Sequence, residues 1–190
     1  MESSAGYAEP VILAFGDSLT AGYRVDARDS YPARLQRLLR EKGYSYKVVN
    51  AGVSGDTTAG GAARIGWALQ HDPEIVIIQL GANDGLRGLP IREMRRNLGL
   101  IIEACRKKGA KVLLAGMEIT PNLGEEYSRE FREVFPELAK KYDVPLLPFF
   151  LKDVAARPEL TQPDGVHPLA EGYAIVTQTV WHHLEPMLKK

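Results

Sequence analysis

The segment from Val11 to Tyr23 reads VILAFGDSLTAGY, and the rest of the chain is best interpreted outward from it. Five apolar-leaning residues run directly into Gly16, Asp17 and Ser18. This pattern predicts a buried strand that ends in a short polar turn and delivers the Ser18 side chain to one edge of a sheet. In open α/β sheets, ligands bind at that edge, beyond the carboxyl ends of the strands. Ser18 is therefore a candidate nucleophile, provided that the chain also supplies a base and donors for an oxyanion.

Strands and helices alternate along the remainder of the chain. Further apolar runs predict strands at 46–51, 74–80, 111–115 and 144–149, the last irregular because of its prolines. Apolar spacing predicts the intervening helices, with Ser30 as a cap, a final helix starting at Pro168, and a kink or break at Pro136. Five strands alternating with five helices predict a parallel sheet inside a three-layer α/β/α sandwich. We expect one domain over residues 10–190 after a flexible N-terminus of residues 1–9.

The composition excludes several classes of function. Lys and Arg total 24, as do Asp and Glu, so the balance argues against nucleic-acid binding and against a polybasic membrane patch. No apolar run approaches the ~20 residues that span a bilayer, so we expect no stable membrane insertion. The single cysteine, Cys105, excludes an intrachain disulfide, and its place in an apolar helical stripe favours a core role.

The N-terminal residues MESSAGYAEP have neither the basic region nor the apolar region of a signal peptide. The compartment expected by default is therefore the cytoplasm, or the periplasm or exterior if a leader has been removed. The sequence leaves the oligomeric state open.

The candidate base is one of four histidines. His71 falls in a connection at the opposite edge of the sheet, and His182 and His183 fall late in the last helix. His167 instead stands at the start of that helix, three residues after Asp164. A carboxylate beside an imidazole fixes its tautomer and stabilises the imidazolium, so this pair suits proton transfer. Taken alone, however, D-G-x-H is also the pattern of an ordinary turn.

Three groups are candidate oxyanion donors: the backbone N–H of Ser18, the backbone N–H of Gly55 and the side-chain amide of Asn83. They follow the first three strands, so a parallel sheet brings them to one edge. One such donor contributes roughly 3 kcal/mol in a serine hydrolase. The alternative for Asn83 is that its amide satisfies its own turn. The neighbouring carboxylates are expected to brace the loops by accepting backbone N–H bonds, namely Asp17, Asp56 and Asp84.

Four sequence blocks together carry a family resemblance: GDSLTAGY, NAGVSGDTT, GANDGLRG and DGVHP. In this order and at this spacing the chain resembles the SGNH hydrolases, the GDSL family of esterases and lipases. The absence of G-x-S-x-G argues against an α/β-hydrolase elbow. The resemblance implies a flavodoxin-like fold, a triad of Ser18, Asp164 and His167, and an oxyanion hole of Ser18, Gly55 and Asn83. It further implies hydrolysis of acyl esters or thioesters without a metal or cofactor.

The tract 127–150 extends the resemblance to the family branch that contains thioesterases, lysophospholipases and arylesterases. In that branch the segment corresponding to Met117–Gly124 is expected to line the acyl cleft. Leu123 stands where the family usually has an aromatic residue, and Leu169 stands where it often has Asn.

The main prediction is a serine esterase that acts on small acyl esters with short to medium chains, because a compact domain without a lid insertion offers a shallow cleft. These substrates include aryl and alkyl esters and extend to thioesters and lysophospholipids. One alternative is a carbohydrate-ester deacetylase. Another is a non-enzymatic, flavodoxin-like domain that binds phosphate or a nucleotide, since Gly-rich turns after strands suit phosphate. Neither a P-loop motif nor a dinucleotide-binding motif supports that last alternative.

Overall fold

The structure is a computed structural model that describes residues 9–190. The predicted flexible segment 1–9 lies outside the described residues apart from Glu9, which forms an ion pair with Arg40. Within the described range, none of the helices is long and apolar enough to cross a bilayer.

A five-stranded parallel sheet forms the centre of the molecule, in the order β2-β1-β3-β4-β5. The strands are β1 (Val11–Gly16), β2 (Lys47–Gly52), β3 (Pro73–Gln79), β4 (Lys111–Ala115) and β5 (Leu146–Leu147). Strands β1, β3 and β4 are mostly inaccessible to solvent, because helices cover both of their faces. The two residues of β5 lie between prolines, which lack the N–H that a longer strand would need. This order is the flavodoxin type, in which the chain changes direction between β1 and β3.

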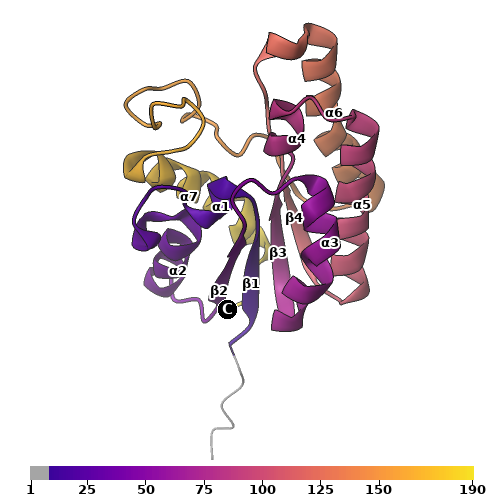
Figure 1. The fold of residues 1–190 in the computed structure, drawn as a ribbon. Helices are drawn as coiled ribbons and strands as arrows, with labels where there is room; N and C mark the ends of the chain where they lie inside the picture. Colours follow the sequence, from indigo (N-terminus) through magenta and orange to yellow (C-terminus); the bar gives the residue numbers. More distant parts are fainter. Residues whose placement is uncertain (1–8) are drawn as a thin grey trace, which may run out of the picture.

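Helices cover the two faces of the sheet unequally, as Figure 1 shows. One face carries α2 (Tyr31–Glu41) and α7 (Ala170–Leu184), which contact each other. The other face carries α3 (Thr58–Ala68), α5 (Ile91–Lys107) and α6 (Glu125–Tyr142). The predicted three-layer α/β/α sandwich is therefore confirmed.

Two short helices stand outside the five predicted ones, α1 (Ser18–Ala21) and α4 (Ala82–Leu86). They are too short to show an apolar period in the sequence, yet they begin directly after β1 and β3. Short 3-10 segments complete the described helical structure: η1 (Ala27–Asp29), η2 (Leu69–His71), η3 (Pro121–Leu123) and η4 (Glu185–Met187).

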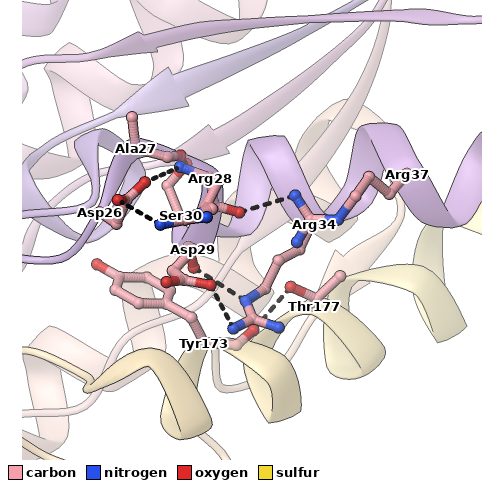
Figure 2. A network of polar contacts seen from close by, with 9 residues as sticks. All are labelled: Asp26, Ala27, Arg28, Asp29, Ser30, Arg34, Arg37, Tyr173 and Thr177. Carbon is pink, nitrogen blue, oxygen red and sulfur yellow. Dashed lines mark hydrogen bonds and ion pairs between the residues drawn. The ribbon is translucent and has the colours of Figure 1, made fainter.

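The start of α2 differs from the prediction that Ser30 caps it. Ser30 occupies the capping position, but its hydroxyl donates backward to the carbonyl of Ala27 at 2.8 Å, as Figure 2 shows. The first turn is instead tied by Arg34, which donates to the carbonyl and the carboxylate of Asp29. This polar corner holds the connection between β1 and α2 beside Tyr173 of α7.

Pro136 does not break α6, which runs continuously from Glu125 to Tyr142. Pro136 is on the exposed side of the helix. Because proline has no N–H, the carbonyl one turn earlier lacks a helical partner, and water can bind it there. Apolar side chains bury the helix before and after the proline, including Phe131 and Leu138. The last helix also starts later than predicted, at Ala170, because Pro168 pairs with Thr161 in an antiparallel bridge.

Candidate active site

Ser18 is the first residue of α1, immediately beyond the carboxyl end of β1. Asp17 caps this helix, and its carboxylate accepts the backbone N–H of Leu19 at 2.9 Å. Ser18 is 9% exposed, so only a small part of the residue reaches solvent. The backbone N–H of a first helical residue has no acceptor inside the helix, which leaves the Ser18 N–H free to bind a ligand.

Ser18, His167 and Asp164 form a continuous line of hydrogen bonds. The Ser18 hydroxyl lies 2.8 Å from Nε2 of His167, and Nδ1 of His167 lies 2.8 Å from a carboxylate oxygen of Asp164. Within the line, the carboxylate orients the imidazole and the imidazole faces the hydroxyl. Chemically, this arrangement can remove a proton from Ser18 and return it to a leaving group.

Asp164 is held as a carboxylate by its own turn. Partial burial acts to raise the pKa of Asp164, but the backbone N–H groups of His167 and Val166 and the His167 ring outweigh it, so the pKa is lowered. The turn itself is closed by Gln162, whose backbone N–H donates to the carbonyl of His167 at 2.7 Å. The side chain of Gln162 also donates to the carbonyl of Tyr23, which joins the histidine loop to the segment after α1.

Tyr23, the last residue of the opening sequence block, packs against the histidine. Its ring centroid lies 4.7 Å from that of His167, with 46° between the ring planes. The contact limits rotation of the imidazole, and sequence reasoning did not identify it. The signal was present, because Tyr23 ends the quoted stretch, but only the folded chain brings it to residue 167.

The predicted oxyanion donors lie around one cleft. Gly55 has a φ of +82°, a conformation that favours glycine, and within residues 9–190 its N–H donates to no protein acceptor. The Asn83 amide donates one hydrogen to the carbonyl of Asp56 at 2.9 Å. That bond joins α4 to the loop between β2 and α3 rather than closing a turn around Asn83 itself. The second amide hydrogen is free to face the cleft.

The cleft has a volume of about 350 Å³, and its lining contains the candidate triad and the candidate oxyanion donors together. It is lined by Ser18, Leu19, Tyr23, Ser54, Gly55, Ala82, Asn83, Leu86, Asp164, Val166 and His167. It lies where the carboxyl ends of β1, β2 and β3 meet, on the side where α1 and α4 appear in Figure 1.

A family model described as the GDSL-like lipase/acylhydrolase family matches residues 14–175. The chain belongs to this family. It is 40% identical over 183 residues to an arylesterase of Vibrio mimicus, covering 96% of this chain and 92% of the relative. It is 39% identical to thioesterase 1/protease 1/lysophospholipase L1 of Escherichia coli strain K12, covering 95% and 86%. The crystal structure of TesA is similar with a TM-score of 0.91 and 40% identity, covering 94% of this chain and 99% of that one.

These comparisons confirm the predicted SGNH-hydrolase family and the predicted class of ester hydrolase. They give no support to the alternative of a non-enzymatic binding domain. The comparisons establish the family, whereas the contacts within the candidate site are those of this chain's own structure.

Among the described residues, the carboxylates of Asp17 and Asp84 accept backbone N–H bonds as expected, whereas the Asp56 carboxylate accepts from the Arg64 side chain instead. Asp84 is 2% exposed and accepts both the N–H and the hydroxyl of Thr58, at 2.9 and 2.6 Å. Asp56 forms an ion pair of 2.7 Å with Arg64, a residue that sequence reasoning did not single out. Asp17 is inaccessible to solvent, and burial raises its pKa to about 7 even though the Leu19 N–H acts to lower it.

A second, apolar groove of about 300 Å³ continues from the cleft through Ala82, Leu86 and Val166. The segment Met117–Gly124 was expected to line the acyl cleft, and its first half, 117–120, does line this groove. Sequence reasoning missed the opposite wall, which comes from the connection between β5 and α7. The residues of that wall are Phe149, Leu151, Ala155, Ala156 and Gly165.

The remaining histidines and the cysteine lie outside the cleft. His71 contacts Trp67 at the far end of α3, and His183 in α7 hydrogen-bonds the carbonyl of Thr179. Cys105 is fully buried, and burial raises its thiol pKa to about 12, so it is not a nucleophile near neutral pH. Within the described residues, no three His, Cys, Asp or Glu side chains are grouped so as to hold a metal ion.

Proposed function

We propose that the protein hydrolyses carboxylic esters through an acyl-enzyme formed on Ser18. One observation carries the proposal: the Ser18–His167–Asp164 line, with both hydrogen-bond distances at 2.8 Å, opens into a cleft that also holds oxyanion donors. A serine hydroxyl is a weak nucleophile until an adjacent base activates it, and this line supplies that base.

In the acylation step, the Ser18 oxygen attacks the ester carbonyl while Nε2 of His167 takes the hydroxyl proton. The carbon–oxygen bond to the leaving alcohol then breaks, and His167 gives the proton to that oxygen. Water attacks the acyl-enzyme by the same route and releases the carboxylic acid. Asp164 holds Nδ1–H throughout and stabilises the imidazolium.

Negative charge develops on the carbonyl oxygen during both attacks. The N–H groups of Ser18 and Gly55 and the free hydrogen of the Asn83 amide are the donors that would bind this oxygen. Such donors are effective because they are fixed before the reaction and need no reorganisation during it.

The apolar groove is the proposed site for the acyl chain. Its walls are apolar side chains such as Met117, Ile119, Phe149 and Leu151, and it begins at the cleft that contains Ser18. A groove of about 300 Å³ suits short to medium acyl chains better than long ones. We include aryl and alkyl esters, thioesters and lysophospholipids among the substrates, because the similar proteins of Vibrio mimicus and Escherichia coli are named arylesterase and thioesterase 1/protease 1/lysophospholipase L1.

A fluorophosphonate probe tests the nucleophile directly. We expect it to label Ser18 in the active protein, and we expect the Ser18→Ala variant to be unlabelled and to lose nearly all turnover. Peptide mapping identifies the modified residue. Labelling of any other residue, or an active preparation that is not labelled, would overturn the mechanism.

A series of p-nitrophenyl esters from acetate to palmitate tests the acyl preference. We expect the largest kcat/KM at short to medium chain length, and a preference for long-chain emulsified fats contradicts the proposal. Acetylated sugars belong in the same series. Turnover of these sugars well above that of aryl acetates would favour the alternative of a carbohydrate-ester deacetylase.

A further inference from the structure

The guanidinium group of Arg64, in α3, makes one ion pair with a carboxylate and two hydrogen bonds to backbone carbonyls. Its Nε donates to the Asp56 carboxylate at 2.7 Å. Its Nη1 and Nη2 donate to the carbonyls of Ala51 and Gly16, both at 2.9 Å. The side chain is 19% exposed, and the guanidinium lies over the ring of Phe15 at 4.1 Å from the centroid. A planar group held by three bonds and one stacking contact has little freedom to move.

The acceptors of these bonds stand beside the residues of the proposed oxyanion hole. Gly16 ends β1, two residues before Ser18, and its carbonyl also accepts the N–H of Val53 at 3.0 Å. That second bond ties the end of β1 to the loop that carries Gly55. Asp56 directly follows Gly55 in this loop.

Asn83 reaches the same network from the third strand. Its amide donates to the carbonyl of Asp56, whose carboxylate is the one that Arg64 binds. One guanidinium therefore connects the strand end before Ser18, the loop of Gly55 and, through Asp56, the amide of Asn83.

We propose that Arg64 is a positioning residue that sets the spacing of the oxyanion donors on Ser18, Gly55 and Asn83. The inference rests on the proposed function, because the donors matter only if an oxyanion forms. Arg64 itself does not line the cleft that contains Ser18, so it acts through the groups that it holds. Lysine cannot replace it, since an ammonium lacks the planar fork that binds three separate acceptors.

A substitution at Gly60 is a second, independent way to disturb the contact between Asp56 and Arg64. A Cβ at this position would lie 1.9 Å from a carboxylate oxygen of Asp56, so the carboxylate occupies the space beside the glycine. Replacing Gly60 with alanine must displace that carboxylate from Arg64. Gly66 lies in the same helix, and a Cβ there would have no atom within 4 Å. Gly66→Ala is therefore the matched control.

The experiment compares Arg64→Ala, Arg64→Lys and wild type in steady-state hydrolysis of a short p-nitrophenyl ester. We expect both variants to lose kcat by on the order of 10²-fold, because displacing reacting groups by about 1 Å has that effect. We expect KM to change by less than about threefold, since the acyl groove is untouched. Added guanidinium, at millimolar concentrations that do not unfold the protein, should restore part of kcat to Arg64→Ala and none to Arg64→Lys.

The Gly60→Ala variant and its control Gly66→Ala test the proposal even if Arg64→Ala does not fold. We expect Gly60→Ala to lower kcat at least tenfold and Gly66→Ala to leave kcat unchanged, although both substitutions favour a helix. The positioning role is overturned if Arg64→Ala or Gly60→Ala retains the wild-type kcat, if only KM changes, or if guanidinium restores nothing. An inactive wild type, or labelling that misses Ser18, would instead refute the proposed function and is recognised by those separate measurements.

Discussion

The two sides of the proposed substrate cavity are held in different ways. On the side of the proposed oxyanion donors, directional bonds hold the backbone segments: Asp84 binds Thr58, Arg64 binds Asp56 and Asp17 caps the start of α1. On the acyl side, the groove is lined by apolar side chains of the connections after β4 and β5. One residue of that wall, Ala156, has a φ of +61°, in the region that non-glycine residues seldom adopt.

This difference separates rate from substrate preference. A hydrogen bond weakens steeply when its angle or length changes, so the oxyanion side keeps its donors in one arrangement. Dispersion contacts are individually weak and have no preferred direction, so the acyl side tolerates changes of shape. Substitutions on the first side should lower kcat for every ester, and substitutions on the second should change which ester is preferred.

After Ser18→Ala, the largest effect is expected from Asp164→Asn. The amide nitrogen would face Nδ1 of His167 and favour the tautomer with its proton on Nε2, which cannot accept the proton of Ser18. We expect kcat to fall by about 10³- to 10⁴-fold, as in triads of the same geometry. Steady-state kinetics with circular dichroism as the folding control measure this, and a loss under tenfold would show that the carboxylate is dispensable.

Asn83→Ala should lower kcat by about 10²- to 10³-fold through loss of one oxyanion donor. Because the amide also binds the carbonyl of Asp56, Asn83→Asp is a useful companion that keeps the size but not the donor. Both variants should retain a KM close to that of wild type. If KM rises while kcat stays constant, Asn83 binds the substrate and not the developing charge.

The buried carboxyl of Asp17 should make stability depend on pH. Burial raises its pKa to about 7 from an ordinary value of 3.8, so between these values the folded state keeps a proton that the unfolded state releases. Its contribution is fully present below about pH 4 and is lost as pH rises through about 7. Asp17→Asn keeps the acceptor for Leu19 N–H but cannot ionise.

The free energy of unfolding, measured in urea from pH 4 to pH 8, tests this. Wild type should lose stability relative to Asp17→Asn over that range, by on the order of 4 kcal/mol, given about 1.4 kcal/mol per pKa unit. Parallel pH profiles for the two proteins would mean that the carboxyl stays ionised when buried.

The smallest effect is expected on the acyl side. Ile119→Ala removes apolar surface from the groove wall, so kcat/KM for hexanoate and octanoate esters should fall about 5- to 10-fold. Hydrolysis of acetate, whose acyl group does not fill the groove, should change less than twofold. Leu100→Ala, at an exposed leucine of α5 outside the groove, is the matched control. An equal loss for acetate would contradict the separation of the two sides.

The sequence by itself determined the order of strands and helices and the identity of the polar turns. Apolar runs and helical stripes are local patterns, so the strand at Val11 and the helix that follows Ser30 could be recognised without the fold. The residues of the proposed triad could also be named from the sequence, because each stands in a block that carries the family resemblance.

Only the tertiary structure decided which distant groups meet. Arg64 reads as one charged residue in a weak helical stripe, and nothing local indicates that it reaches the ends of β1 and β2. The wall from 149 to 156 likewise lacks a periodic pattern, because it is a connection whose shape depends on what it packs against. Pro136 shows the same limit in reverse, since the helix continues through it where a local break was one of the predicted outcomes. Local patterns follow from backbone geometry, whereas these contacts depend on which distant segments pack together in the folded protein.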